Sequence, residues 1–186
     1  MSRSHLENYS EQDAKKSWDL LEEAISKIYE KKYYELSYEE LYRNVYFLVL
    51  HRHGDLAYQN VEKVIHRHLK NFYHQLPNAQ NEDFLNKFND IWTDATEMLK
   101  AIARIFLYMD RNYIMPKLLN PIKMVGYQVF LEVFFRNKDF NAKFKQQLIG
   151  LIRNERDGMP VDRILLKNIL SMLVNLLFFL YISPLK

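Results

Sequence analysis

The sequence lacks cysteine altogether, so its 186 residues offer no disulfide framework and no thiolate for catalysis or metal binding. A chain without cysteine is typical of a reducing compartment, and we expect the cytoplasm or the nucleus. Glycine and proline are scarce, with four and five residues, and no stretch alternates apolar and polar residues between turn signals. This scarcity argues against a sheet and favours an all-α fold. The first dozen residues contain no apolar run, so we expect no secretory signal.

Charge of one sign is not concentrated anywhere in the chain. The formal net charge is +3, and the basic residues are interleaved with acidic ones, which argues against nucleic-acid binding. The sequence contains no glycine-rich phosphate loop, no nucleophile elbow, no HExxH motif and no sign of a paired-carboxylate site. We therefore expect neither an enzyme nor a bound cofactor.

Histidines are the one group that suggests a metal site. His51 and His53 form one His-x-His pair, and His66 and His68 form another, with His74 further on. On a helix the two rings of such a pair point about 200° apart, so neither pair can chelate one ion. We interpret these histidines as ordinary residues of polar faces and expect no metal.

Apolar residues make up 48% of the chain and aromatic residues 15%, and they recur at helical spacing. After a polar leader at 1–16, the pattern predicts helices over 17–34, 37–53, 55–74, 82–113, 124–135, 140–156 and 162–182. The fourth of these would be a rod about 45 Å long at 1.5 Å per residue. The two prolines of MPKLLNP (115–121) end it.

The second predicted helix has well-marked ends. Ser37 is an N-cap candidate with Glu40 three residues on, the spacing of a capping box. Leu36 and Leu41 stand where a hydrophobic staple would lie. Gly54 suits the left-handed position that follows the end of a helix.

This helix has more apolar surface than one packed face requires. Leu41, Val45 and Leu48 define a core stripe, and three tyrosines spaced four apart widen the apolar arc to about 200°. These are Tyr38, Tyr42 and Tyr46. Deep burial between two neighbouring helices would produce this pattern, and so would a tyrosine recognition surface, since tyrosine is enriched at protein interfaces. The pattern alone leaves both interpretations open.

Four ordered blocks of sequence resemble the N-terminal region of cullins. They are WDLLEEAI (18–25), LSYEELYRNVYFLVLHRHG (36–54), IFLYMDRNYI (105–114) and LIRNERDGMPVDRILLKNI (151–169). The second block is most similar to the cullin-3 class, which binds BTB-domain proteins. The resemblance implies a stack of five-helix cullin repeats, with the first repeat at 17–136 and the start of a second at 137–174. The apolar tail at 175–186 does not continue the family pattern.

The resemblance also implies a function and a site. The chain would be a non-catalytic scaffold module of a cullin–RING ubiquitin ligase, docking a BTB-type substrate adaptor, and adaptors of the related Skp1 or elongin C type would suit the same core motif. Carried over position by position, the adaptor-binding residues are Leu36, Ser37, Tyr38, Glu39, Tyr42, Tyr46, Tyr108 and Arg111. The second alternative for the tyrosines, a recognition surface, is the one that the resemblance favours.

Two departures from the family change what we expect. The leader is polar, whereas BTB-binding cullins often carry an apolar arm there, so affinity for the adaptor would be reduced. The family's region for binding the RING subunit is absent from these 186 residues. We therefore expect no RING subunit as a partner, and a chain that binds adaptors without supporting catalysis would compete with a complete cullin.

The last predicted helix raises an alternative function, that of a membrane-associated helical protein anchored through 164–182. A membrane span needs about 20 apolar residues. Lys167, Asn168 and Asn175 interrupt this segment, and only 169–182 is tolerably apolar. We favour a packed repeat helix over an anchor, and an uncovered apolar face on it would promote self-association.

Overall fold

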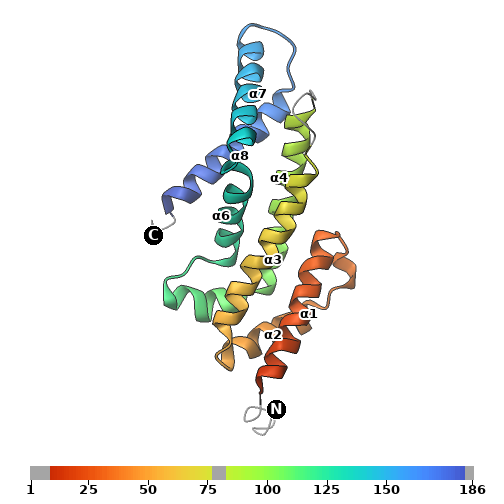
Figure 1. Cartoon of the computed structure of the whole chain (residues 1–186), viewed down its shortest axis with the longest axis vertical. Coiled ribbons are helices and arrows are strands. Elements are labelled where there is room, and N and C mark those ends of the chain that lie inside the picture. Colours follow the sequence, from red (N-terminus) through yellow and green to blue (C-terminus); the bar gives the residue numbers. More distant parts are fainter. Residues whose placement is uncertain (1–8, 77–82, 183–186) are drawn as a thin grey trace. The chain divides into compact units, whose positions relative to one another are not determined.

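The computed structural model describes residues 9–76 and 83–182 (Figure 1). Every regular element in that part of the chain is helical, which confirms the predicted all-α fold. The long helices are α1 (Glu11–Tyr29), α2 (Tyr38–Leu50), α3 (Gly54–His74), α4 (Phe84–Ile105), α6 (Ile122–Phe135), α7 (Lys138–Arg156) and α8 (Arg163–Ile182). Short helical turns are η2 (Tyr33–Glu35), α5 (Leu107–Met109), η3 (Asp110–Ile114) and η4 (Met115–Lys117).

Parts of three predicted features lie outside the described residues. They are residues 1–8 of the polar leader, residue 82 of the fourth predicted helix, and residues 183–186 of the tail. The described residues form two compact units, one of 9–65 with 98–125 and the other of 66–97 with 126–182. The division into cullin repeats at 17–136 and 137–174 stays a prediction.

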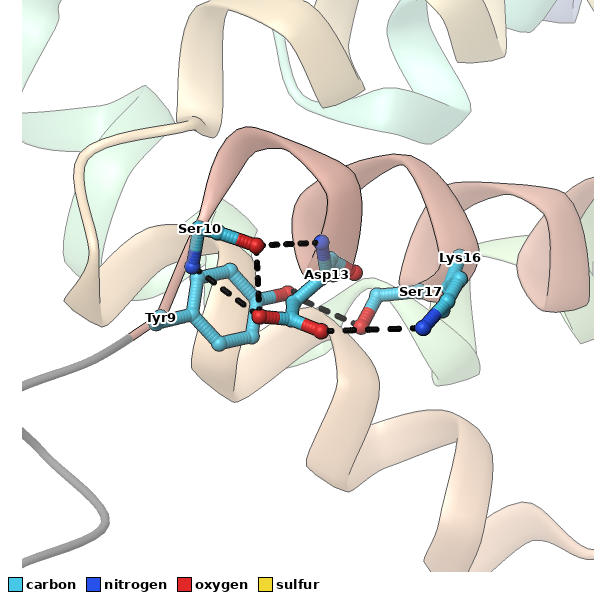
Figure 2. A network of polar contacts seen from close by, with 5 residues as sticks. All are labelled: Tyr9, Ser10, Asp13, Lys16 and Ser17. Atoms are coloured by element: carbon cyan, nitrogen blue, oxygen red, sulfur yellow. Dashed lines mark hydrogen bonds and ion pairs between the residues drawn. The ribbon is translucent and has the colours of Figure 1, made fainter.

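Helix α1 begins at Glu11, six residues before the predicted start at 17, so 11–16 are helical rather than leader. A capping box that the sequence reading passed over begins the helix (Figure 2). The Ser10 hydroxyl accepts from the Asp13 N–H at 3.2 Å, and the Ser10 N–H donates to the Asp13 carboxylate at 3.0 Å. Two N–H groups without helical partners are thereby satisfied, which is why polar residues here are helical.

The capping box predicted at Ser37 is wrong. Ser37 does precede α2, yet its side chain accepts no hydrogen bond from the helix. Its ψ is 91°, whereas the ψ of the working cap Ser10 is 166°. The two serines therefore differ in backbone geometry although both have an acidic residue three positions on.

The role predicted for Gly54 is also wrong, because Gly54 opens α3 rather than ending α2. Arg52 takes the left-handed conformation, with φ of 66°. The N–H of His53 donates to Leu48 O at 2.8 Å and that of Arg52 to Val49 O at 3.2 Å, which is the Schellman pattern. Glycine is needed at 54 for space: a Cβ there would lie 2.8 Å from Cγ of Tyr113 and closer still to the ring edge.

The long rod predicted over 82–113 is interrupted. Helix α4 has 22 residues and is about 33 Å long at 1.5 Å per residue. It ends at Ile105, and the chain continues through a turn at Phe106 into α5 and the π-helical turn η3. Asp110, in η3, links this interruption to the next long helix: its carboxylate accepts a hydrogen bond from the N–H of Ile122, the first residue of α6, at 2.9 Å. Burial raises the pKa of Asp110, and this hydrogen bond opposes the rise.

Each unit has its own apolar core. In the first, α1 buries Trp18, Leu21, Ile25 and Ile28, and α2 buries Leu41, Val45 and Leu48. In the second, the core is rich in phenylalanine rings packed edge to face or stacked; its members include Phe84, Phe88, Phe130, Phe134, Phe140 and Phe144.

Helix α8 buries only one of its apolar faces. Leu165, Ile169, Met172 and Leu176 are buried, whereas Val174, Leu177 and Phe178 are each more than 60% exposed. Among the described residues, no helix combines the length and apolarity that crossing a membrane requires.

Candidate adaptor-docking surface

Helix α2 presents its tyrosines on a flank next to its core stripe. Val45 and Leu48 are fully buried, while Tyr38 is 41% exposed and Tyr42 is 44% exposed. The alternative of deep burial between two helices is therefore wrong for Tyr38 and Tyr42. Large, half-exposed aromatic rings beside a rigid helix are what a protein interface uses.

Tyr108, from a distant segment of the chain, packs against two of these tyrosines. Its ring centroid lies 4.9 Å from that of Tyr46 and 5.9 Å from that of Tyr42, and both pairs meet edge to face. We call Tyr42, Tyr46 and Tyr108 the tyrosine cluster. Burial raises the pKa of the Tyr108 phenol, and Tyr46 and Tyr42 raise it further, so the phenol keeps its proton at neutral pH. The cluster thus combines apolar ring surface with hydroxyl groups, of which that of Tyr108 is neutral.

Tyr108 is held in place by its neighbours in sequence. Met109 beside it is fully buried. Further along, Tyr113 packs its ring on Gly54, donates a short hydrogen bond to Asp55, and accepts one from Lys117 at 2.8 Å. The Lys117 ammonium also lies 4.1 Å from the centre of the Tyr113 ring. These contacts tie the segment that carries Tyr108 to the start of α3.

The remaining predicted residues make fewer contacts than the cluster. Tyr38 and Glu39 occupy the exposed first turn of α2. Leu36 and Ser37 border a small pocket between α1 and α2. Arg111 is exposed three residues after Tyr108, and among residues 9–76 and 83–182 no ring contact or ion pair joins it to the tyrosines.

Sequence reasoning missed an extension of this aromatic surface. Phe47 meets Tyr46 at 5.7 Å between ring centroids, and Tyr9 follows at 6.2 Å from Phe47 and stacks on His51 at 4.4 Å. The Tyr9 hydroxyl is anchored to the Ser17 hydroxyl at 2.8 Å (Figure 2). The sequence offered one signal for this extension, an aromatic residue, Tyr9, directly before the Ser10 capping box. Which rings Tyr9 contacts depends on how α1 packs on α2, and the sequence does not specify that packing.

The surface offers chemistry for recognition. It presents rings, hydroxyl groups and an exposed carboxylate at Glu39. In the part of the chain that the structure describes, no three or more histidine, aspartate and glutamate side chains are grouped so that they could hold a metal ion.

Comparison with known proteins agrees with this architecture. Residues 18–181 match the model of the cullin alpha solenoid domain. Cullin-3 of Dictyostelium discoideum is 35% identical over 162 residues, which cover 87% of this chain and 21% of that protein. Cullin-3B of Arabidopsis thaliana is 33% identical over 88% of this chain and 22% of its own length. Cullin-3 of Caenorhabditis elegans is 30% identical over 94% of this chain and 23% of its own length.

The chain thus spans about a fifth of the length of the curated relatives that it matches. The match to the domain model covers most of the 186 residues and includes the tyrosine cluster, the interrupted fourth helix and the greater part of α8. On these findings, the chain belongs to the cullin family.

Proposed function

We propose that this chain is the adaptor-docking module of a cullin–RING ubiquitin ligase scaffold and binds a BTB-domain adaptor through the tyrosine cluster. The observation that carries the proposal is the packing of Tyr108 against Tyr42 and Tyr46 on an open face of α2. Three residues that the family resemblance assigns to adaptor binding come from two separate segments and meet at one place. Support for the class of partner comes from the similarity to proteins named cullin-3.

The physical case for docking is the form of the surface. Tyr42 is 44% exposed, so a partner that covers it would remove a large apolar area from water without unfolding α2. Its rotamer is already restrained by Tyr108, which lowers the entropy lost on binding. Tyrosine and arginine are common among the few residues that dominate binding energy. Arg111 is exposed and lies three residues after Tyr108 in the sequence.

The role we propose is that of a scaffold, because the chain positions an adaptor and contributes no reacting group. We place this role in the cytoplasm or nucleus. No observation favours the membrane-anchored alternative. Taken by themselves, these 186 residues would bind an adaptor without recruiting a RING subunit, and would inhibit a complete cullin according to the ratio of their concentration to the dissociation constant.

The test is a binding assay with purified proteins. The 186-residue chain is titrated into a BTB-domain adaptor that binds a full-length cullin-3 in the same assay, and the heat of binding gives Kd. We expect a saturable complex, weaker than that of the full-length protein, with no RING subunit retained when one is added. A chain that is folded by circular dichroism but does not bind the adaptor would refute the proposal. Retention of the RING subunit with ubiquitin transfer would refute the competitor role.

A further inference from the structure

A small crevice lies beside the candidate surface, between α1 and the segment that leads into α2. Its volume is about 110 Å³. Leu20, Ala24, Leu36 and Leu41 give it apolar walls. Leu20 is 44% exposed and Leu36 is half-buried, so these two walls are open to solvent, whereas Ala24 and Leu41 belong to the buried core. A crevice of this size and lining fits one aliphatic side chain.

The rim of the crevice is acidic. Glu23, Glu35 and Glu40 line it together with a single cation, Lys27. That cation is already shared, because its ammonium lies 2.9 Å from Glu23 and 3.5 Å from Glu35. Carboxylates therefore outnumber cations at the rim, and they attract a positive group on whatever enters.

One carboxylate at the rim has no partner of its own. Glu40 stands in the first turn of α2, where the helix dipole favours negative charge, and its side chain forms no ion pair within the described residues. The Ser37 hydroxyl beside it makes no cap bond to the helix. Both groups line the crevice, and among the described residues neither side chain has a hydrogen-bond or ion-pair partner.

From this crevice we infer a second contact for the adaptor, which rests on the proposed function. The crevice takes one aliphatic side chain of the adaptor, and a lysine or arginine next to that side chain pairs with Glu40 and Glu23. Leu36 and Ser37 border both the crevice and the start of α2, so one partner can cover the tyrosine cluster and the crevice together. Helix α1 then contributes to selection among adaptors.

The absence of native cysteine allows a direct test of occupancy. Leu20→Cys introduces the only thiol of the chain, and Asp19→Cys, at the exposed neighbouring position, is the matched control. Alkylation rates are measured with and without the BTB-domain adaptor. At an adaptor concentration of about ten times Kd, labelling at 20 should slow about tenfold, because about one-tenth of the sites remain free, while labelling at 19 changes little.

A second measurement tests the charge. Glu40→Lys should weaken adaptor binding about tenfold at low salt, with a smaller loss for Glu40→Gln, and the losses should shrink as salt screens the interaction. Glu62→Lys, an exposed glutamate on α3, should leave Kd unchanged. Loss of binding by Leu20→Cys with retention by Asp19→Cys also supports a contact at the crevice.

The outcomes separate the two proposals. If the wild-type chain binds and Tyr42→Ala abolishes binding, but position 20 stays equally reactive and Glu40→Lys binds normally, docking stands and the crevice contact is wrong. Protection at 20 that grows with the concentration of this chain alone assigns the crevice to a second copy and overturns the inference. Failure of the wild-type chain to bind the adaptor removes both.

Discussion

The two units place similar pairs of aromatic rings in opposite surroundings. In the first, the rings of Tyr46 and Tyr108 meet edge to face at 4.9 Å, beside a Tyr42 that is 44% exposed. In the second, Phe88 and Phe140 meet in the same way at 5.1 Å, and Phe88 is fully buried. Ring geometry is nearly the same in both places. The hydroxyl group and the exposure differ, and under the proposed function they separate a cluster that stabilises the fold from one that meets a partner.

The difference in exposure has a consequence for free energy. A buried phenylalanine contributes to folding because its whole surface leaves water and because its removal opens a cavity. A half-exposed tyrosine has contributed only part of its surface, and the remainder is available to an interface. Substitutions in the two clusters should therefore separate stability from binding.

The largest effect is expected in the phenylalanine core. Phe88→Ala removes a ring that packs against Phe134, Phe140 and Phe144 and should lower the free energy of unfolding by about 3–5 kcal/mol. Denaturant titration followed by circular dichroism measures it. Phe178→Ala, at a ring that is 65% exposed on α8, is the matched control and should cost less than about 0.5 kcal/mol. Equal losses would erase the distinction between core and surface rings in this unit.

The tyrosine cluster should show the reverse behaviour. Tyr42→Ala is expected to weaken adaptor binding by about 2 kcal/mol or more, as truncation of an interface anchor does, while the melting temperature changes little. Titration calorimetry and thermal melts give the two quantities. Tyr34→Ala serves as control, because Tyr34 is 85% exposed and lies outside the candidate surface. If Tyr42→Ala unfolds the protein instead, the cluster belongs to the core.

The sequence predicted the features that depend on nearby residues better than those that depend on contacts between distant segments. Helical periodicity gave α6, α7 and α8 to within about two residues, and it placed Tyr42 and Tyr46 on one flank of α2. Those features depend on neighbours within a turn or two of helix. The pairing of Tyr108 with them came from family resemblance, because no local pattern specifies a contact between distant segments.

The errors have the same origin. Ser37 and Gly54 each matched a local signal, yet the surrounding structure assigned the cap geometry to Ser10 and the left-handed residue to Arg52. Gly54 is required by the ring of Tyr113, and Tyr9 belongs to the aromatic surface because α1 packs on α2. Contacts between elements decided these positions, and a single sequence without aligned relatives does not display them.

An effect of intermediate size is expected at Gly54, where the ring of Tyr113 makes a contact within the fold. Alanine is normally favoured over glycine in a helix by about 1 kcal/mol. Gly54→Ala should nevertheless destabilise the protein by about 1–3 kcal/mol, because its Cβ would enter the space of the Tyr113 ring. The double variant with Tyr113→Ala should recover part of the loss in denaturant titrations, since the clash is removed. Additive losses would show that the ring does not impose the glycine.

The smallest effect concerns the two serines before α1 and α2, and it sharpens the contrast between fold and surface at single hydroxyl groups. Ser10→Ala should lower the free energy of unfolding by about 1 kcal/mol, because its hydroxyl caps α1. Ser37→Ala should lie within about 0.5 kcal/mol of the wild type, because that hydroxyl caps nothing. Any loss of adaptor affinity in Ser37→Ala would then report contact with the partner.

The contribution of the Ser10 cap to stability should depend on pH. Hydrogen bonds from Ser10 lower the pKa of Asp13 below its ordinary value, so the stability that they contribute is present at neutral pH and is lost as the pH falls through the lowered pKa. The difference between wild type and Ser10→Ala should therefore be largest near pH 7 and shrink below about pH 4. Ser37→Ala should follow the wild type throughout this range. Thermal melts of the wild type, Ser10→Ala and Ser37→Ala, recorded at steps of about one pH unit between about pH 3 and 7, test both statements. If Ser37→Ala loses as much stability as Ser10→Ala, Ser37 does cap its helix.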